Sequence, residues 1–306
     1  MNCTPDDIAD AARRIAGKVR YTPILEVAGA ELGHDTPLVF KLEYTQFSGT
    51  FKARGATNFL AASDIGQAGV VAASGGNHGA AVAWAAQRDG LTANIFVPTI
   101  SAPAKVDRLR TYGAIVHQVG NVYAESLTAS QQFQAATGAT AIHAYEDSLV
   151  LAGAGTTGLE FEAQTGQLDS VLVATGGGGL AGGIATYLGD RTTVVVCETH
   201  HTTAYASAAA AGGPVDVEVS GIAADALGAS RIGDIAWEAL SSNSAQSVLV
   251  GDDHVVQAKN WLWDNLRIVV EPSAATALAA LLSGNYRPSP GERIGIVLCG
   301  ANTSIS

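Results

Sequence analysis

Short apolar runs alternate with helical stretches along most of the chain. The clearest apolar runs are at residues 38–42, 69–73, 94–97, 115–119, 170–174, 193–196 and 294–298. Helical patterns lie between several of these runs, at residues 80–88, 103–112 and 122–137. Strands that are apolar throughout and separated by helices are typical of parallel sheets with helices on both faces. The pattern therefore predicts an α/β fold.

The same pattern predicts two α/β units. A compact βαβαβα stretch over residues 68–145 forms the smaller unit, and residues 1–67 and 146–306 together form the larger one. Sheets of this kind bind ligands at the carboxyl ends of their strands. We therefore expect the functional motifs in the turns between strands and helices. An opening helix is also expected, with Thr4 as its N-cap and Pro5 in its first turn.

Composition narrows the class of protein. The chain has 306 residues, of which 47% are apolar and 15% charged, as in a packed globular protein of about two domains. Its formal net charge of -11 gives no electrostatic reason to bind nucleic acid or an anionic membrane. The first residues lack the pattern of a signal peptide, and no apolar run approaches the roughly 18 residues of a membrane span. Because Cys3, Cys197 and Cys299 form no CxxC pair, we expect a cytoplasmic protein.

Four consecutive glycines, Gly176 to Gly179, follow the apolar run 170–174 and precede Leu180 in a helical stretch. Without side chains, their N–H groups can converge on an anion, which the positive end of the following helix also favours. A flexible linker is the alternative interpretation, but a linker is not expected between a buried strand and an apolar helix. We therefore predict a phosphate-binding turn. It is not a nucleotide P-loop, because no Gly-Lys-Ser/Thr sequence follows it.

Lys52 is one of only five lysines in the chain, and it lies between Phe51 and Ala53 near the start of a predicted helix. Burial and a positive helix end would both lower its pKa, and a neutral lysine amine is a nucleophile that can form a Schiff base. Taken alone, a lysine is more often a solvated surface residue. Lys52 is therefore a candidate only in combination with other features.

A third feature, the loop from Ser74 to Gly79, also comes directly after an apolar run. Small residues with exposed N–H groups at the start of a helix suit a carboxylate, and Asn77 and His78 add side-chain donors or acceptors. An ordinary turn with a capping Asn is an equally good interpretation of this loop on its own.

Together these three features are what an aldehyde cofactor that bears a phosphate requires. In this combination the sequence resembles the pyridoxal-phosphate enzymes of fold type II, which have the tryptophan synthase β-like fold. Within them it resembles the group of threonine/serine dehydratases and serine racemases. The resemblance covers nearly the whole chain in the family's order. Besides the glycine turn and the Asn77 loop, it rests on residues 21–24, 41–43, 51–56, 220–225, 271–273 and 298–302.

The resemblance implies a role for each matching residue. Lys52 would bind pyridoxal 5'-phosphate covalently and later move the Cα proton of the substrate. The other cofactor contacts would be Phe51 and Asn77 at the ring, Gly176, Gly177, Gly178, Gly179 and Leu180 at the phosphate, Gly221 at the ring edge and Cys299 at the pyridine nitrogen. The substrate carboxylate would meet Ser74, Gly76, Asn77 and His78.

The implied activity is that of a dehydratase, or ammonia-lyase. Such an enzyme converts L-threonine, L-serine or a related β-hydroxy amino acid to a 2-oxo acid and ammonia by β-elimination. A neutral thiol at the ring nitrogen, here Cys299, makes a weaker electron sink than an Asp and suits prompt loss of a β-leaving group. The family also implies a homodimer and a smaller, mobile domain that closes over the substrate. Because the chain ends soon after Asn302, we expect no C-terminal regulatory domain.

Serine racemase and 3-hydroxyaspartate dehydratase, both of the same family, are alternative functions. Racemases carry a second Ser as acid/base where this chain has Gly75, and they hold a divalent cation through a Glu and an Asp six residues later. Here Ala204 follows Glu198 at that distance, so we predict no metal site. No Lys or Arg lies between Arg110 and Arg191, which argues against a substrate with a second carboxylate. A non-catalytic ligand-binding protein on this fold is a less favoured alternative.

Overall fold

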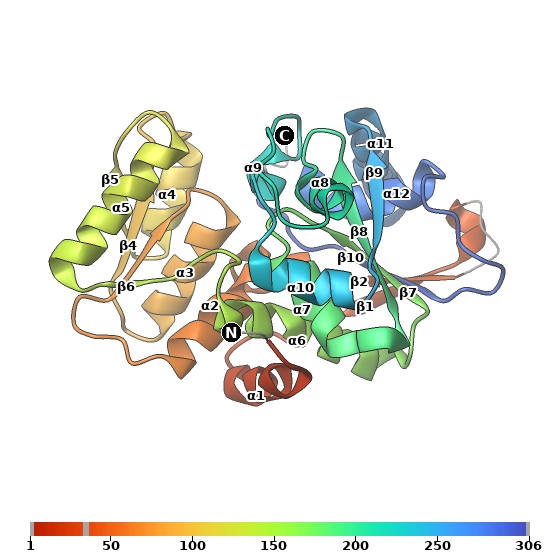
Figure 1. Cartoon of the computed structure of the whole chain (residues 1–306), viewed down its shortest axis with the longest axis horizontal. Coiled ribbons are helices and arrows are strands. Elements are labelled where there is room, and N and C mark those ends of the chain that lie inside the picture. Colours follow the sequence, from red (N-terminus) through yellow and green to blue (C-terminus); the bar gives the residue numbers. More distant parts are fainter. Residues whose placement is uncertain (1–2, 33–36, 304–306) are drawn as a thin grey trace.

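The strands of the protein form two sheets. The computed structural model describes residues 3–32 and 37–303, and Figure 1 shows the sheets in two lobes that lie side by side. The larger sheet has the strand order β1-β2-β10-β7-β8-β9. Its strands are β1 (Ile24–Val27), β2 (Leu38–Lys41), β10 (Ile294–Val297), β7 (Ser170–Ala174), β8 (Thr193–Thr199) and β9 (Gln246–Val250). Neighbours in this sheet are parallel except β1 and β2, which are antiparallel.

The smaller sheet has the order β5-β4-β3-β6 and is parallel throughout. Its strands are β5 (Ile115–Gln118), β4 (Ala93–Val97), β3 (Val70–Ala73) and β6 (Thr140–Ala141). Each of the seven predicted apolar runs overlaps one of the observed strands. The predicted α/β fold with two parallel sheets is therefore confirmed. The antiparallel edge strand β1 and the strands β6 and β9 were not predicted.

Helices surround both sheets. The smaller lobe contains α3 (Asn77–Arg88), α4 (Pro103–Thr111) and α5 (Tyr123–Thr137). The other α-helices are α1 (Pro5–Ile15), α2 (Lys52–Ala62), α6 (Ser148–Thr165), α7 (Gly179–Leu188), α8 (Ala204–Ala211), α9 (Ala224–Leu227), α10 (Asp234–Ser242), α11 (Asp252–Leu266) and α12 (Pro272–Leu282). Short 3-10 turns are η1 (Gly29–Leu32), η2 (Glu43–Thr45), η3 (Phe47–Gly49) and η4 (Gly189–Arg191).

The first helix forms for the reasons that the sequence indicates. The Thr4 amide donates to the Asp7 carboxylate at 2.9 Å, and the Asp7 amide donates to the Thr4 hydroxyl at 3.2 Å, which completes a capping box. Ile8, Ala11 and Ile15 share one helix face and are buried. The predicted N-cap and the predicted opening helix are therefore confirmed.

Each sheet has its own buried apolar cluster. The larger one includes Phe40, Leu172 and Ile296 from neighbouring strands of the larger sheet. The smaller one gathers around Ile95 and also takes in Phe59 of α2. The smaller sheet lies within residues 68–145, as expected, but the domain boundaries and the mobility of the smaller unit stay predictions.

The fold places the sequence motifs at the carboxyl ends of the strands in each sheet. The loop after Ala73 at the end of β3, the glycine turn after Ala174 at the end of β7 and Cys299 beyond the end of β10 all follow carboxyl ends of parallel strands. The carboxyl ends of the strands are the usual ligand sites of α/β sheets.

Candidate active site

A cavity lies where these strand ends meet the starts of α2, α7 and α12. Its atom-free space, including the mouth that opens to solvent, is about 470 Å³. Residues 51–52, 174–181 and 226–227 line it, together with Asn77, Tyr145, Glu271, Ser273 and Cys299. The structure thus brings together most of the residues that the sequence predicts at a cofactor, although these come from widely separated parts of the chain.

Lys52 is the first residue of α2, and its side-chain amine projects into this cavity. The amine donates a hydrogen bond of 2.7 Å to the carbonyl oxygen of Ala144 and lies 5.2 Å from the ring centroid of Phe51. Burial disfavours the charged ammonium and lowers the pKa of Lys52 to about 8. A substantial fraction of Lys52 is therefore neutral, and nucleophilic, at physiological pH.

The glycine turn packs closely against the Tyr145 side chain and the Leu227 backbone. A Cβ atom on Gly177 would lie 2.3 Å from the Tyr145 ring, and one on Gly176 would lie 2.8 Å from the Leu227 Cα atom. Gly178 has φ +87°, which favours glycine, and α7 begins at the next residue. The first N–H groups of a helix have no partner within the helix, so the start of α7 offers donors to a phosphate.

A hydrogen-bonded carboxylate, that of Glu271, also lines the cavity. The Glu271 carboxylate accepts from Asn77 Nδ2 at 2.7 Å, from the Ser273 hydroxyl at 2.7 Å and from the Asn302 amide at 3.0 Å. Burial raises the pKa of Glu271 despite these donors. The Oδ1 atom of Asn77 is buried and has no hydrogen-bond partner among the described residues. A buried acceptor without a partner marks a place for a ligand donor.

Cys299 completes the cavity beside Lys52. Its main-chain carbonyl accepts a 3.0 Å hydrogen bond from the Phe51 amide, which ties the lysine-bearing turn to the end of β10. The residue is buried, and burial raises the pKa of its thiol far above the usual value. Cys299 is therefore a neutral thiol at physiological pH.

Other predicted residues lie outside the group that lines this cavity. His78 is buried with its Nε2 atom 2.9 Å from the Ile142 carbonyl, and burial lowers its pKa to about 3, so the ring is neutral. Ser74 accepts a 3.3 Å hydrogen bond from the amide of Gly76. Gly221 is exposed, and a Cβ atom there would lie 2.7 Å from the Asp252 carboxylate. The roles expected for these residues stay predictions.

Some contacts at the cavity involve residues that had no predicted role. Glu271 belongs to a segment that carries the family resemblance, but no role was predicted for it, and Ala144 and Tyr145 belong to the connection from β6 to α6. Their contacts with Asn77, Lys52 and Gly177 bring together positions far apart in the sequence.

The residues present fit a phosphate-bearing aldehyde. The buried amine of Lys52 can bind the aldehyde, the start of α7 can bind the phosphate, and Asn77 Oδ1 needs a donor. Over residues 3–32 and 37–303, no group of three or more His, Cys, Asp or Glu residues could hold a metal ion. In the same part of the chain, no helix is long and apolar enough to cross a membrane.

Comparison with known proteins identifies the class. The family model described as pyridoxal-phosphate dependent enzyme matches residues 15–300, so the chain belongs to this family. It is 36% identical to phenylserine dehydratase of Ralstonia pickettii, over 97% of this chain and 92% of the relative. It is 31% identical to L-threonine ammonia-lyase of Thermotoga maritima, over 99% of this chain and 76% of that protein.

A solved structure agrees with this assignment. The structure of maize serine racemase matches with a TM-score of 0.93 and 31% identity, over 100% of this chain and 95% of that one. The predicted family, the fold type II architecture, the enzyme class and pyridoxal 5'-phosphate as the cofactor are confirmed. The protein is thus a pyridoxal-phosphate-dependent enzyme of the group that contains dehydratases and ammonia-lyases.

Proposed function

We propose that the protein is a dehydratase that releases a 2-oxo acid and ammonia from L-threonine, L-serine or a related β-hydroxy amino acid. One observation carries the proposal: the amine of Lys52, with its pKa lowered to about 8, lines the same cavity as the neutral thiol of Cys299. Relatives named phenylserine dehydratase and L-threonine ammonia-lyase support the same reaction class.

The residues of the cavity have distinct tasks in this proposal. Pyridoxal phosphate, when bound, supplies an electron sink for the Cα–H bond of an amino acid. The amides of Gly176 to Gly179 and the positive end of α7 bind its phosphate. Lys52 Nζ holds and moves the Cα proton, for which a pKa near 8 suits neutral pH. The neutral Cys299 thiol leaves the sink weak, which favours loss of a β-hydroxyl over a long-lived carbanion.

The substrate carboxylate is assigned to the turn from Ser74 to His78. This turn joins β3 to α3, so the N–H groups at the start of α3 are available to an anion. Asn77 connects the turn to the cavity through its hydrogen bond to Glu271. The neutral His78 ring adds no charge there.

The alternative functions have weaker support. Among the described residues that line the cavity, Lys52 alone is basic, so a second substrate carboxylate would lack a dedicated cation. Gly75 has no side chain to exchange a proton on the opposite face, which disfavours racemisation. Binding without catalysis needs neither a lysine of lowered pKa nor a thiol at the ring.

A panel of β-hydroxy amino acids tests the proposal. The holoenzyme would be incubated with L-threonine, L-serine, phenylserine and 3-hydroxyaspartate, and 2-oxo acid, ammonia and both substrate enantiomers would be measured. We expect equal amounts of 2-oxo acid and ammonia from at least one of the first three, and little racemisation. Racemisation without 2-oxo acid, or binding without any product, would refute the proposal.

We also propose that the protein works in the cytoplasm as a homodimer, with closure of the smaller lobe over the substrate. The support for a reducing compartment is that Cys3, Cys197 and Cys299 are all free thiols. The family resemblance supports the dimer and the closure. Light scattering on the purified holoenzyme tests the dimer, because it measures the molar mass directly.

A further inference from the structure

The turn that leads into Lys52 has an unfavourable backbone conformation. Ser48 has φ +57° and Gly49 has φ +70°, so two consecutive residues lie in the left-handed region. That region disfavours a residue with a side chain, such as Ser48. Contacts from the surrounding structure must therefore hold this turn in place.

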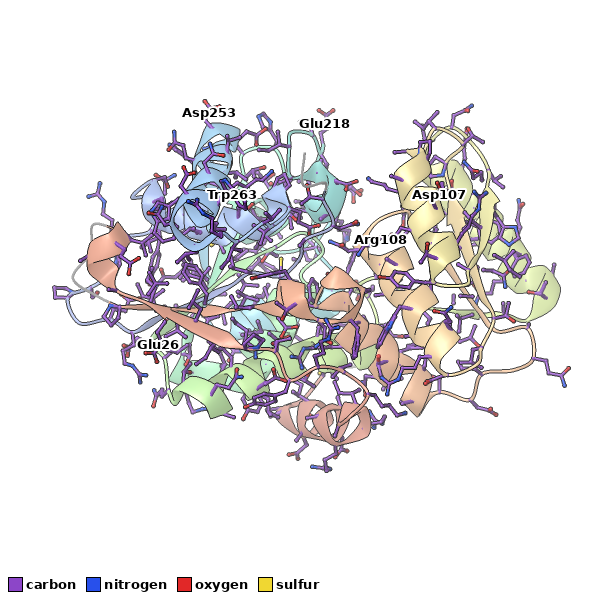
Figure 2. All side chains as sticks on the ribbon, turned by 180° about the vertical axis from the view of Figure 1, so that it is seen from behind. Glu26, Asp107, Arg108, Glu218, Asp253 and Trp263 are labelled. Atoms are coloured by element: carbon purple, nitrogen blue, oxygen red, sulfur yellow. The ribbon has the colours of Figure 1, made fainter. Side chains whose placement is uncertain are left out.

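Several of these contacts come from the smaller lobe. The guanidinium of Arg108, on α4, donates one hydrogen bond to the Ser48 carbonyl and another to Asn302 Oδ1. Trp84, on α3, stacks on Phe47 with ring centroids 4.7 Å apart. Figure 2 labels Arg108 between the two lobes, whereas the neighbouring Asp107 is labelled on the smaller lobe itself.

The two loops that Arg108 contacts carry the reactive groups. Gly49 accepts a 2.9 Å hydrogen bond from the Ala301 amide, and the Phe51 amide donates to the Cys299 carbonyl at 3.0 Å. One loop leads into Lys52, and the other runs from Cys299 to Asn302. Asn302 also donates its amide to Glu271 at 3.0 Å. A single guanidinium therefore spans the lysine loop and the thiol loop from outside the cavity.

We infer that Arg108 is a positioning residue. It fixes the position of Lys52 relative to Cys299 when the smaller lobe packs against the larger one. Its two acceptors are a carbonyl and a side-chain amide, both neutral, so the contact does not depend on an ion pair. The guanidinium suits this task because its N–H groups form a planar fork that can reach two acceptors at once. A lysine ammonium is a compact point charge and would not reproduce the fork.

A second contact between the lobes provides a matched control. Lys105, three residues earlier on α4, forms an ion pair with Asp225 of α9, and both side chains are partly exposed. This pair touches neither the lysine loop nor the thiol loop. Arg110, on the same helix, pairs with Asp107 at 3.3 Å on the surface. Exposed pairs of this kind contribute little.

Hydrogen exchange on the holoenzyme tests the inference without substrate. Arg108→Lys, Arg108→Ala, Lys105→Ala and Arg110→Ala would be compared with the wild type in peptides that cover residues 47–53 and 298–303. We expect at least about tenfold faster exchange at the amides of Phe51 and Ala301 in both Arg108 variants, with α7 and α12 unchanged. The Lys105 and Arg110 variants should match the wild type.

A second test measures enzyme kinetics and rests on the proposed function. We expect kcat for 2-oxo acid release to fall by about 10- to 100-fold in both Arg108 variants, with a small change in KM, because misplaced groups react slowly. If the wild type makes no 2-oxo acid, the proposed function fails but the exchange comparison still stands.

Three results would overturn the inference. Wild-type exchange and kcat in Arg108→Lys would show that the charge alone matters. Equal effects in Lys105→Ala would show that any lobe contact suffices. Faster exchange throughout the molecule in both Arg108 variants would assign Arg108 to general stability.

Discussion

The Lys52 amine donates a 2.7 Å hydrogen bond to the Ala144 carbonyl, in the segment that links the smaller sheet to α6. The next residue, Tyr145, lies against Gly177 in the phosphate turn. One connecting segment therefore contacts both the nucleophile and the anion site. Because the Ala144 carbonyl occupies an N–H donor of Lys52, this contact must be exchanged when the amine takes up the cofactor.

The lowered pKa of Lys52 predicts how the cofactor-free protein captures pyridoxal phosphate. Only the neutral amine attacks an aldehyde, so the rate of capture should rise with pH and reach half of its maximum near pH 8. Stopped-flow absorbance across a pH series measures this rate. Lys52→Ala should show no covalent capture and should lose about 10³-fold or more in product formation. A half-maximum near pH 10.5, the ordinary lysine value, would contradict the prediction.

Cys299 predicts the balance between elimination and racemisation. A serine at this position is also neutral, so Cys299→Ser should retain dehydratase activity to within about tenfold of the wild type. Cys299→Asp should favour a protonated ring nitrogen and deepen the electron sink. We expect that variant to change the visible absorption of the holoenzyme and to raise the ratio of racemised substrate to 2-oxo acid. Chiral chromatography measures that ratio, and an unchanged ratio in Cys299→Asp would count against the assigned role of the thiol.

The interior strands were predictable because they are buried on both faces. Residues 170–174 and 294–297 are buried throughout, so their apolar runs stand out in the sequence. Only the last residue of β1 is buried, and β9 is exposed at its first two residues. Edge strands such as these carry a mixed pattern that does not differ clearly from that of a loop. Their pairing depends on the neighbouring strand.

The local motifs of the site were predictable, but its long-range contacts were not. The glycine turn and Lys52 each depend on a few adjacent residues. The Asn77–Glu271 hydrogen bond joins positions 194 residues apart, and no spacing rule indicates it. The contact between His78 Nε2 and the Ile142 carbonyl, at 2.9 Å, likewise joins positions 64 residues apart, and the predicted role of His78 at the substrate carboxylate stays a prediction.

Gly75 predicts a gain of racemisation. A Cβ atom there would lie 3.4 Å from Val97 Cγ1 and 3.8 Å from Ser101 Oγ, so a small side chain fits with little adjustment. Gly75→Ser should fold normally and supply a hydroxyl on the opposite face of the substrate. We expect measurable D-enantiomer from L-serine, with the wild type and Gly75→Ala as controls. Equal racemisation in the Ser and Ala variants would refute this role of the hydroxyl.

The surroundings of Glu198 predict that removal of divalent cations has no effect. Both oxygens of its carboxylate are occupied, by the amides of Tyr205 and Ala206, each at 2.8 Å. Ala204 offers no side-chain oxygen. Treatment with EDTA and addition of Mg²⁺ or Mn²⁺ should therefore leave the activity and the unfolding temperature unchanged. A loss with EDTA that either cation restores would contradict the prediction.

A buried cluster of four charges beneath the lysine helix predicts a large loss of stability. Arg54 contacts Glu43 at 2.7 Å and Glu160 at 3.0 Å, and Lys41 contacts Glu160 at 2.6 Å. Removal of one carboxylate leaves a buried guanidinium poorly compensated. We therefore expect Glu43→Gln to lower the free energy of unfolding by about 3–5 kcal/mol. The exposed pair of Arg13 and Asp10 is the control, and Arg13→Ala should cost less than about 1 kcal/mol.

The pH dependence of the same variant is a second test. Burial alone would raise the pKa of Glu43, but Arg54 and Lys41 together hold it below its usual value. In the unfolded protein the Glu43 carboxyl has a pKa of 4.5, and in the folded protein its pKa is lower. The Glu43 carboxylate therefore stabilises the folded protein above pH 4.5, and this stabilisation is lost as the pH falls through the folded-state pKa. The difference between wild type and Glu43→Gln in urea unfolding should therefore be greatest near pH 7 and shrink below pH about 4.5. A difference that is constant from pH 7 to pH 4 would show that the carboxylate charge is not what stabilises the cluster.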